Sequence, residues 1–164
     1  MKKKRSALVF IVTLLALTLL TSTALADNSR NFTASLKGGE EVPANDSKAQ
    51  GQAIFKISKD GESISYKLIV ANIENVSMAH IHLAPAGVNG PVVAWLYPGS
   101  PPPQLIPGRF DGILAEGTLT AANLVGPLAG GTLKDLLENM ASGNAYVNVH
   151  TSQFPGGEVR GQIR

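Results

Sequence analysis

Three histidines are the residues of this chain best suited to chemistry, and two of them form a close pair. His80 and His82 flank a single isoleucine, and His150 follows much later in the chain. Successive side chains of a β-strand point to opposite faces, so the first two share one face if their segment is a strand. Such a pair supplies two imidazole ligands, and a third histidine completes a set that suits Cu²⁺ or Zn²⁺. With an ordinary pKa of about 6.5, these rings are mostly neutral and free to bind a metal at pH 7.

The segments around these histidines alternate between apolar and polar residues, as strands on the surface of a core do. Ala79, Ile81 and Leu83 alternate with the first two histidines and are expected to face inward. In a last predicted hairpin, made of residues 144–150 and 158–164, the inward set is Val147, Val149, Val159 and Ile163. The outward set is then Tyr146, Asn148, His150, Glu158, Arg160 and Gln162.

If the two segments are neighbours in the sheet, the three imidazoles form one outward-facing cluster beside Glu158. That carboxylate would be a fourth ligand or would orient an imidazole. The alternative is that the histidines are polar surface residues, or that His80 and His82 hydrogen-bond neighbouring loops.

The rest of the sequence predicts short strands, at residues 32–37, 50–58, 63–71, 78–83, 92–97 and 110–119. Asp60-Gly61 predicts a hairpin, because glycine accepts the positive φ that a tight turn requires. The proline-rich segment 98–108 predicts a long surface loop, since proline lacks the amide proton of a sheet ladder. Residues 132–140 predict one helix, capped by Thr132 and closed by Gly143. The expected fold is therefore all-β, a Greek-key β-sandwich or barrel (superoxide-dismutase-like or immunoglobulin-like) with one short helix near 132–141.

The first 26 residues have the pattern of a secretory signal peptide. A positive segment, Lys2–Arg5, precedes the apolar run Ala7–Leu20 and the small-x-small triplet that ends at Ala26. The alternative is an uncleaved membrane anchor, but the apolar run is shorter than the ~20 residues of a spanning helix. We expect a signal peptide at 1–26, a flexible leader at 27–31 and a domain at 32–164. The mature protein would be secreted, to the periplasm or the cell surface, with no stable membrane span.

Removal of this segment changes the charge of the protein. It takes away four of the 14 basic residues and none of the 12 acidic ones, so the net charge falls from +2 to −2. No basic excess remains to favour a nucleic-acid partner. The chain also has no cysteine, which excludes both the lipid attachment of a bacterial lipoprotein and stabilising disulfides.

Three motifs in the chain resemble those of the CHRD (chordin-type) domain. They are Leu36–Pro43 (LKGGEEVP), the histidine pair followed by Gly87–Pro91 (GVNGP), and Tyr146–Thr151 (YVNVHT) followed by Pro155–Gln162 (PGGEVRGQ). The resemblance covers residues 32–164 and implies a free-standing, secreted, bacterial-type β-sandwich module. It implies no settled activity, and the residues that match its histidine motifs are His80, His82 and His150.

The His-Ile-His strand is also similar to copper-zinc superoxide dismutase, but that enzyme has a disulfide and needs more histidines than the three present here. We therefore expect at most one copper or zinc ion, at His80, His82 and His150 with Glu158, and assign no catalytic residue. A secreted binding module is the first hypothesis for the function. The alternatives are a mononuclear three-histidine metalloenzyme, redox or hydrolytic, and a metal-free structural or adhesion module at the cell surface. The sequence indicates no protein partner.

Overall fold

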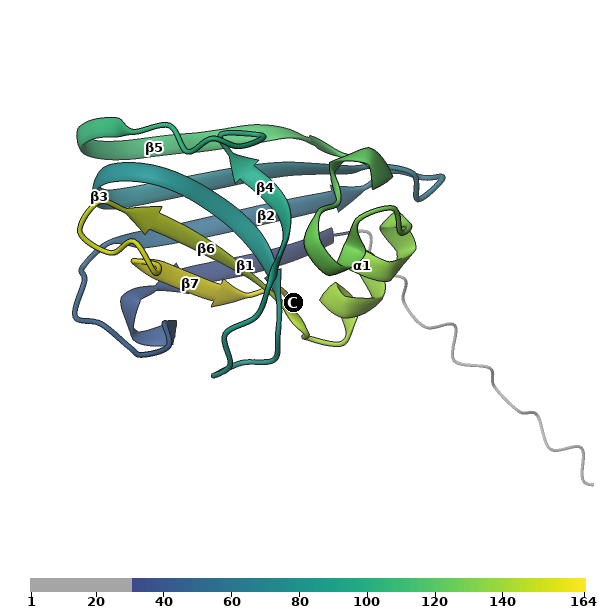
Figure 1. Cartoon of the computed structure of the whole chain (residues 1–164), viewed down its shortest axis with the longest axis horizontal. Coiled ribbons are helices and arrows are strands. Elements are labelled where there is room, and N and C mark those ends of the chain that lie inside the picture. The colour runs from purple at the N-terminus through teal and green to yellow at the C-terminus, as the bar shows by residue number, and fades with distance from the viewer. Residues whose placement is uncertain (1–30) are drawn as a thin grey trace, which may run out of the picture.

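Residues 31–164, which a computed structural model describes, form a mostly antiparallel β structure (Figure 1). The strands are β1 (Asn31–Lys37), β2 (Gln50–Ile57), β3 (Ile64–Leu83), β4 (Val92–Tyr97), β5 (Ile106–Leu119), β6 (Ala145–Thr151) and β7 (Val159–Gln162). The helices are α1 (Leu133–Ala141) and three short 3-10 turns, η1 (Gly38–Glu40), η2 (Ala121–Asn123) and η3 (Gly126–Leu128). The expected signal peptide, and the expected leader up to residue 30, lie outside the described residues.

The sheet closes on itself into a barrel. β2 pairs with β1, β1 with β7, β7 with β6, β6 with β3, and β3 returns to β2. β4 and β5 pair with β3 outside this closed path. The predicted all-β class and the predicted hairpin at Asp60-Gly61 are confirmed, and Gly61 has the positive φ, 79°, that such a turn needs.

The longest strand, β3, makes this closure possible. Over its 20 residues it pairs first with β2 and β5 and then, from Val76 onward, with β6 and β4. The change of partners coincides with register shifts near Asn72 and Asn75, whose φ angles are 56° and 54°. Asparagine tolerates this left-handed conformation better than most residues, and bulges bend a strand without ending it. The expectation of two separate strands, at 63–71 and 78–83, was therefore wrong.

The predicted surface loop at 98–108 needs a smaller correction. β5 begins at Ile106, which pairs with Val76, so Pro107 and Gly108 belong to the strand. A register shift in the β3–β5 ladder falls beside Pro107, and such irregular places are where a strand tolerates proline. Residues 98–105 do form a loop.

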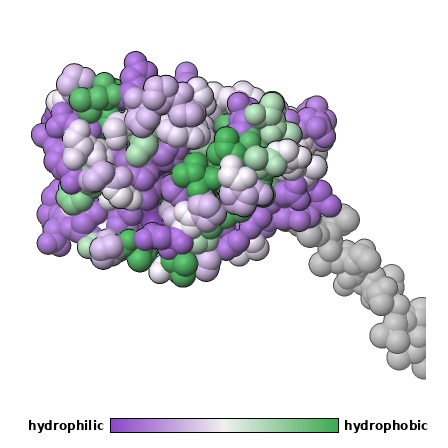
Figure 2. Space-filling view, in the orientation of Figure 1, coloured by the Kyte–Doolittle hydropathy of each residue, from purple (hydrophilic) through white to green (hydrophobic). Residues whose placement is uncertain are grey.

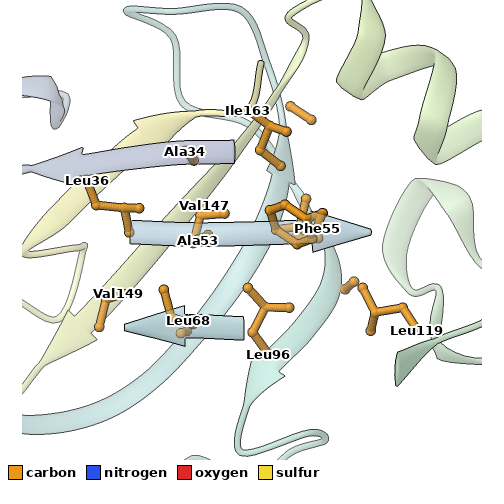
Figure 3. Packing of buried hydrophobic residues seen from close by; sticks show 14 of the residues in the cluster. Ala34, Leu36, Ala53, Phe55, Leu68, Leu96, Leu119, Val147, Val149 and Ile163 are labelled. Carbon is orange, nitrogen blue, oxygen red and sulfur yellow. The ribbon is translucent and has the colours of Figure 1, made fainter. Parts of the chain in front are cut away.

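The core fills the inside of the barrel. Phe55 and Leu68 pack with Val147, Leu96 and Ile163, all of them at most 1% exposed (Figure 3). The face of the molecule shown in Figure 2 is largely hydrophilic, with hydrophobic residues scattered over it. Within residues 31–164, no helix has the length and apolar character needed to cross a membrane.

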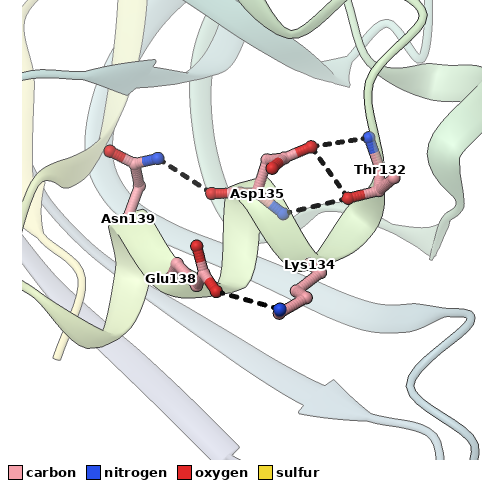
Figure 4. A network of polar contacts seen from close by, with 5 residues as sticks. All are labelled: Thr132, Lys134, Asp135, Glu138 and Asn139. Carbon is pink, nitrogen blue, oxygen red and sulfur yellow. Dashed lines mark hydrogen bonds and ion pairs between the residues drawn. The ribbon is translucent and has the colours of Figure 1, made fainter.

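The helix α1 lies at one end of the barrel, and its start is the one predicted (Figure 1). The hydroxyl of Thr132 accepts a hydrogen bond from the amide of Asp135, whose carboxylate accepts one from the amide of Thr132 at 2.8 Å (Figure 4). This reciprocal capping box satisfies amides that the first helical turn leaves free. Leu133, Leu136 and Met140 of the predicted apolar stripe are buried.

Candidate metal centre

The three histidines lie together on the outer face of the barrel. β3 and β6 are direct neighbours, and their register pairs Met78 with His150 and His80 with Asn148. The residues that alternate with the histidines, among them Ile81 and Val149, enter the core. The prediction that two distant segments bring the three imidazoles to one face is therefore confirmed.

This outer face is covered, however, so the histidines are not exposed. His80, His82 and His150 are only 3%, 8% and 6% exposed. The interpretation of the histidines as polar surface residues is therefore wrong, because the segments 84–91 and 152–157 fold over them and contact the imidazole rings. A covered position shields an ion from water and from competing ligands.

Two of the rings are oriented by backbone carbonyls. His82 Nδ1 lies 2.9 Å from the carbonyl of Gly90, and His150 Nδ1 lies 3.0 Å from that of Pro155. A carbonyl only accepts, so Nδ1 carries the proton in both rings and Nε2 keeps its lone pair. Histidines that bind metals nearly always have this arrangement, with the second ring nitrogen donating to a carbonyl or a carboxylate.

The spacing of the ring nitrogens suits one ion. His80 Nδ1 and His150 Nε2 are 3.2 Å apart, and one nitrogen from each of the three rings fits within 4.8 Å of the others. Zinc–nitrogen bonds of about 2.0–2.1 Å at tetrahedral angles place two ligands about 3.3 Å apart. Nε2 of His80 and Nε2 of His82 are buried and have no hydrogen-bond partner. The cluster thus contains one pair of ring nitrogens at the spacing of two metal ligands, and two further ring nitrogens that have no partner.

All three rings are neutral in ordinary conditions. Burial, together with the nearby His150 and His82, lowers the pKa of His80 to about 3. Burial also lowers the pKa of His82 to about 4, although the Gly90 carbonyl opposes the shift. The pKa of His150 is lowered by burial as well. A neutral imidazole is the form that binds a metal, so His80 and His82 keep their lone pairs far below pH 7.

Aromatic rings frame the cluster. The ring of Trp95 meets that of His80 edge to face at 4.2 Å, and Tyr146 stacks on His82 at 4.8 Å. The guanidinium carbon of Arg160 lies 3.4 Å from the centre of the Tyr146 ring. Arg160 also donates to the carbonyls of Pro85 and Val88, which holds the covering segment 84–91 in place.

These histidine strands carry the motifs of a known family. The family model of the CHRD domain matches residues 32–163, nearly the whole described part of the chain. The chain belongs to the CHRD family. A search of curated proteins found no match, and neither did a search of solved structures.

In this CHRD domain, Glu158 lies outside the group of close ligand atoms. It directly precedes β7, and its amide donates to the carbonyl of Val149 at 2.8 Å. Its carboxylate, however, accepts a hydrogen bond of 2.6 Å from the hydroxyl of Ser47. The three histidines form a group without it.

A different carboxylate of the CHRD domain lies beside the cluster. Glu41 is 7% exposed, and its Oε2 accepts a hydrogen bond of 3.3 Å from Asn148, the residue opposite His80. Burial raises the pKa of Glu41 to about 7, against the opposing effects of Arg160 and Asn148. Sequence reasoning placed Asn148 on the outer face but gave Glu41 no role. Glu41 follows a 3-10 turn, where no strand or helix periodicity shows which way a side chain points.

Proposed function

We propose that this CHRD domain is a secreted binding module that holds one copper or zinc ion through His80, His82 and His150. The observation that carries the proposal is the pair of carbonyl-oriented imidazoles, His82 and His150, that lie in one cluster with His80. Their Nδ1 atoms donate to the carbonyls, so Nε2 of each ring keeps its lone pair; that of His82 has no partner, and that of His150 faces His80 Nδ1. Carbonyl contacts of this kind fix the ring orientation before an ion arrives. Three nitrogen ligands leave one position open in a tetrahedral site.

The burial of the ligands favours binding over turnover. Each histidine is less than a tenth exposed and lies under a segment that is hydrogen-bonded to it or to its neighbours. An ion can be held in such a place, whereas a substrate larger than water would need the covering segments to move. Glu158 remains a candidate for the open position, in which its carboxylate would turn from Ser47 toward the histidines.

Calorimetric titration of the purified protein with Zn²⁺ and Cu²⁺ tests the proposal. We expect one ion per chain, and loss of that binding in the double variant His80→Ala/His82→Ala. Gln153→Ala, an exposed change in the covering turn, is the matched control and should bind as the wild type does. Binding that survives the double histidine change would contradict the proposal. Glu158→Gln tests the fourth ligand: an affinity equal to that of the wild type would mean that the three histidines hold the ion without Glu158.

Secretion is part of the same proposal and rests on the N-terminal pattern of charge, apolar run and small residues. Expression of the full chain in a bacterial host, followed by fractionation and intact-mass measurement, tests it. We expect mature protein outside the cytoplasm that begins at Asp27. Full-length protein retained in the cytoplasm would contradict it.

A further inference from the structure

Asn148 occupies the middle of the outer face, among the three histidines. It lies directly opposite His80 on the neighbouring strand, two residues from His150 on its own strand, and diagonal to His82. Side chains directly opposite on one face are about 5 Å apart at Cβ, and diagonal ones are about 7–8 Å apart. A group that is hydrogen-bonded to the Asn148 side chain would therefore lie next to the proposed ion.

Asn148 and Glu41 together present acceptors that nothing in residues 31–164 satisfies. The amide nitrogen of Asn148 donates to Glu41 Oε2, but Asn148 Oδ1 and Glu41 Oε1 are buried and have no partner. Buried polar atoms are nearly always hydrogen-bonded, so these two oxygens point to a donor that belongs there. Two nearby ring nitrogens, Nε2 of His80 and Nε2 of His82, are also buried acceptors to which no group donates.

Gly157 lets the backbone pack closely against these oxygens. A Cβ at this position would lie 2.8 Å from Glu41 Oε1 and would overlap the amide of Asn148. The φ of Gly157, 132°, is one that residues with a side chain rarely adopt. The turn between β6 and β7 therefore approaches the two acceptors closely, which a residue with a side chain at this position would prevent.

We propose that Glu41 and Asn148 accept hydrogen bonds from a water molecule held at the open position of the metal centre, and so act as its positioning residues. This inference rests on the proposed function. A water molecule on a cation is a strong donor with two protons, which matches two free acceptors. Three-histidine centres that keep an open position usually hold a water there.

The assignment distinguishes Glu41 from the other carboxylates near the site. Glu158 already accepts a hydrogen bond from Ser47, and Glu40, the neighbour of Glu41, is exposed. Glu41 is the buried carboxylate with an oxygen left free. Groups that hydrogen-bond to a metal ligand from outside typically change metal affinity by about 10–100-fold when they are removed.

The test compares Glu41→Gln with its matched control Glu40→Gln, which removes the same charge one residue away. Zinc affinity is measured by competition with a chelator, and the unfolding temperature of the metal-free proteins is measured in parallel. We expect Glu41→Gln to weaken Zn²⁺ binding about 10–100-fold and Glu40→Gln to leave it unchanged. The metal-free Glu41→Gln protein should be no less stable than the wild type, because a neutral amide costs less to bury than a carboxylate.

A spectroscopic measurement detects the water itself. In the Cu²⁺-loaded wild type, electron–nuclear double resonance in H₂O and D₂O should show exchangeable protons that are coupled more strongly than the remote N–H protons of the ligand imidazoles, with altered couplings in Glu41→Gln. Absence of such protons, or equal Zn²⁺ affinity of the three proteins, would overturn this inference and leave ion binding intact. A parallel loss of metal-free stability in Glu41→Gln would also overturn it, since Glu41 would then be a structural residue. Failure of the wild type to bind either metal would overturn the proposed function as well.

Discussion

The three imidazoles are not equivalent, although they form one cluster. His82 and His150 each have a carbonyl partner for Nδ1. His80 instead directs Nδ1 to His150, and its Nε2 has no partner. In the metal-free protein the His80 proton therefore lies between two ring nitrogens, and an ion at the same place would replace that contact. His80 is the residue whose surroundings an ion changes most.

The low pKa values of the histidines predict metal binding that tolerates acid. At pH 5.5 a histidine with an ordinary pKa of about 6.5 is about nine-tenths protonated, so three such ligands would together weaken binding about 1,000-fold relative to pH 7.5. His80 and His82, with pKa values of about 3 and about 4, stay neutral at pH 5.5. We expect Zn²⁺ affinity to be nearly constant between pH 7.5 and 5.5 and to fall below pH 4. Calorimetry across this range measures it, and a steep loss near pH 6.5 would contradict the buried geometry.

Trp95, the only tryptophan of the chain, provides a second test at the level of a single residue. Its ring is 4.2 Å from that of His80, so a paramagnetic ion bound there should quench most of its fluorescence. We expect Cu²⁺ to quench the emission with a one-to-one endpoint, while Zn²⁺ should bind without comparable quenching. Titration of wild type and His80→Ala/His82→Ala under the same conditions provides the comparison. Equal quenching in both proteins would place the copper elsewhere.

At the scale of the elements, β3 brings the site together because it changes partners along its length. The bulged region around Asn72 and Asn75 turns the strand from β2 and β5 toward β6, where the histidine-bearing half lies. Asn72 is exposed and has a φ of 56°, so its contribution is mainly conformational. The bend is thus set by the backbone preferences of a few residues.

Substitution of Asn72 tests this interpretation. A left-handed conformation costs a residue with a Cβ about 1–2 kcal/mol, and β-branched residues avoid it most. We expect Asn72→Val to destabilise the protein by about 1–2 kcal/mol and Asn72→Gly to change its stability by less than about 0.5 kcal/mol. Urea unfolding of the three proteins gives the values. Equal destabilisation by valine and glycine would indicate that the asparagine side chain itself matters.

The elements and the site were predictable from sequence to different degrees. The alternation of apolar and polar residues in β6 predicted which residues lie on its outer face, His150 and Asn148 among them. A half-buried strand imposes this two-residue period. The alternation could not reveal that β3 continues through Asn72, since a bulge breaks that period. Nor could it reveal the covering of the histidines or the place of Glu41, because both depend on loops whose residues follow no periodic pattern.

On the scale of the whole molecule, the three histidines and one buried carboxyl group lie in one layer between the barrel and the segments that cover it. The layer contains His80, His82, His150 and Glu41, each less than a tenth exposed. The chain has no cysteine, so no disulfide holds the covering segments to the barrel. An ion in the histidine centre would link β3 with β6, and at 100 times its dissociation constant it would add about 2.7 kcal/mol of stability. The stability of the metal-free protein depends on the charge state of these four side chains.

That dependence has a definite sign. The histidine pKa values are lower in the folded state than the value of about 6.5 in the unfolded chain, so the unfolded chain binds more protons below pH 6.5 and acid destabilises the fold. Glu41 acts in the opposite direction. Its pKa is about 7 when folded and 4.5 in the reference state, so between these values the folded protein holds the extra proton and gains stability as the pH falls.

Three histidines outweigh one carboxyl group, so the metal-free protein should lose stability between pH 6.5 and pH 4. Glu41→Gln removes the opposing group, and we expect its stability to fall more steeply than that of the wild type between pH 7 and pH 5. Glu40→Gln is the control, and its profile should follow that of the wild type because this side chain is exposed. Urea unfolding at pH 7, 6, 5 and 4 in the presence of a chelator measures the three profiles. A wild-type stability that rises toward pH 5 would mean that the histidines are not buried as neutral rings. Parallel profiles for the two variants would mean that Glu41 stays ionised in the folded protein down to about pH 5, and that the layer around the metal centre already contains a donor for its free oxygen.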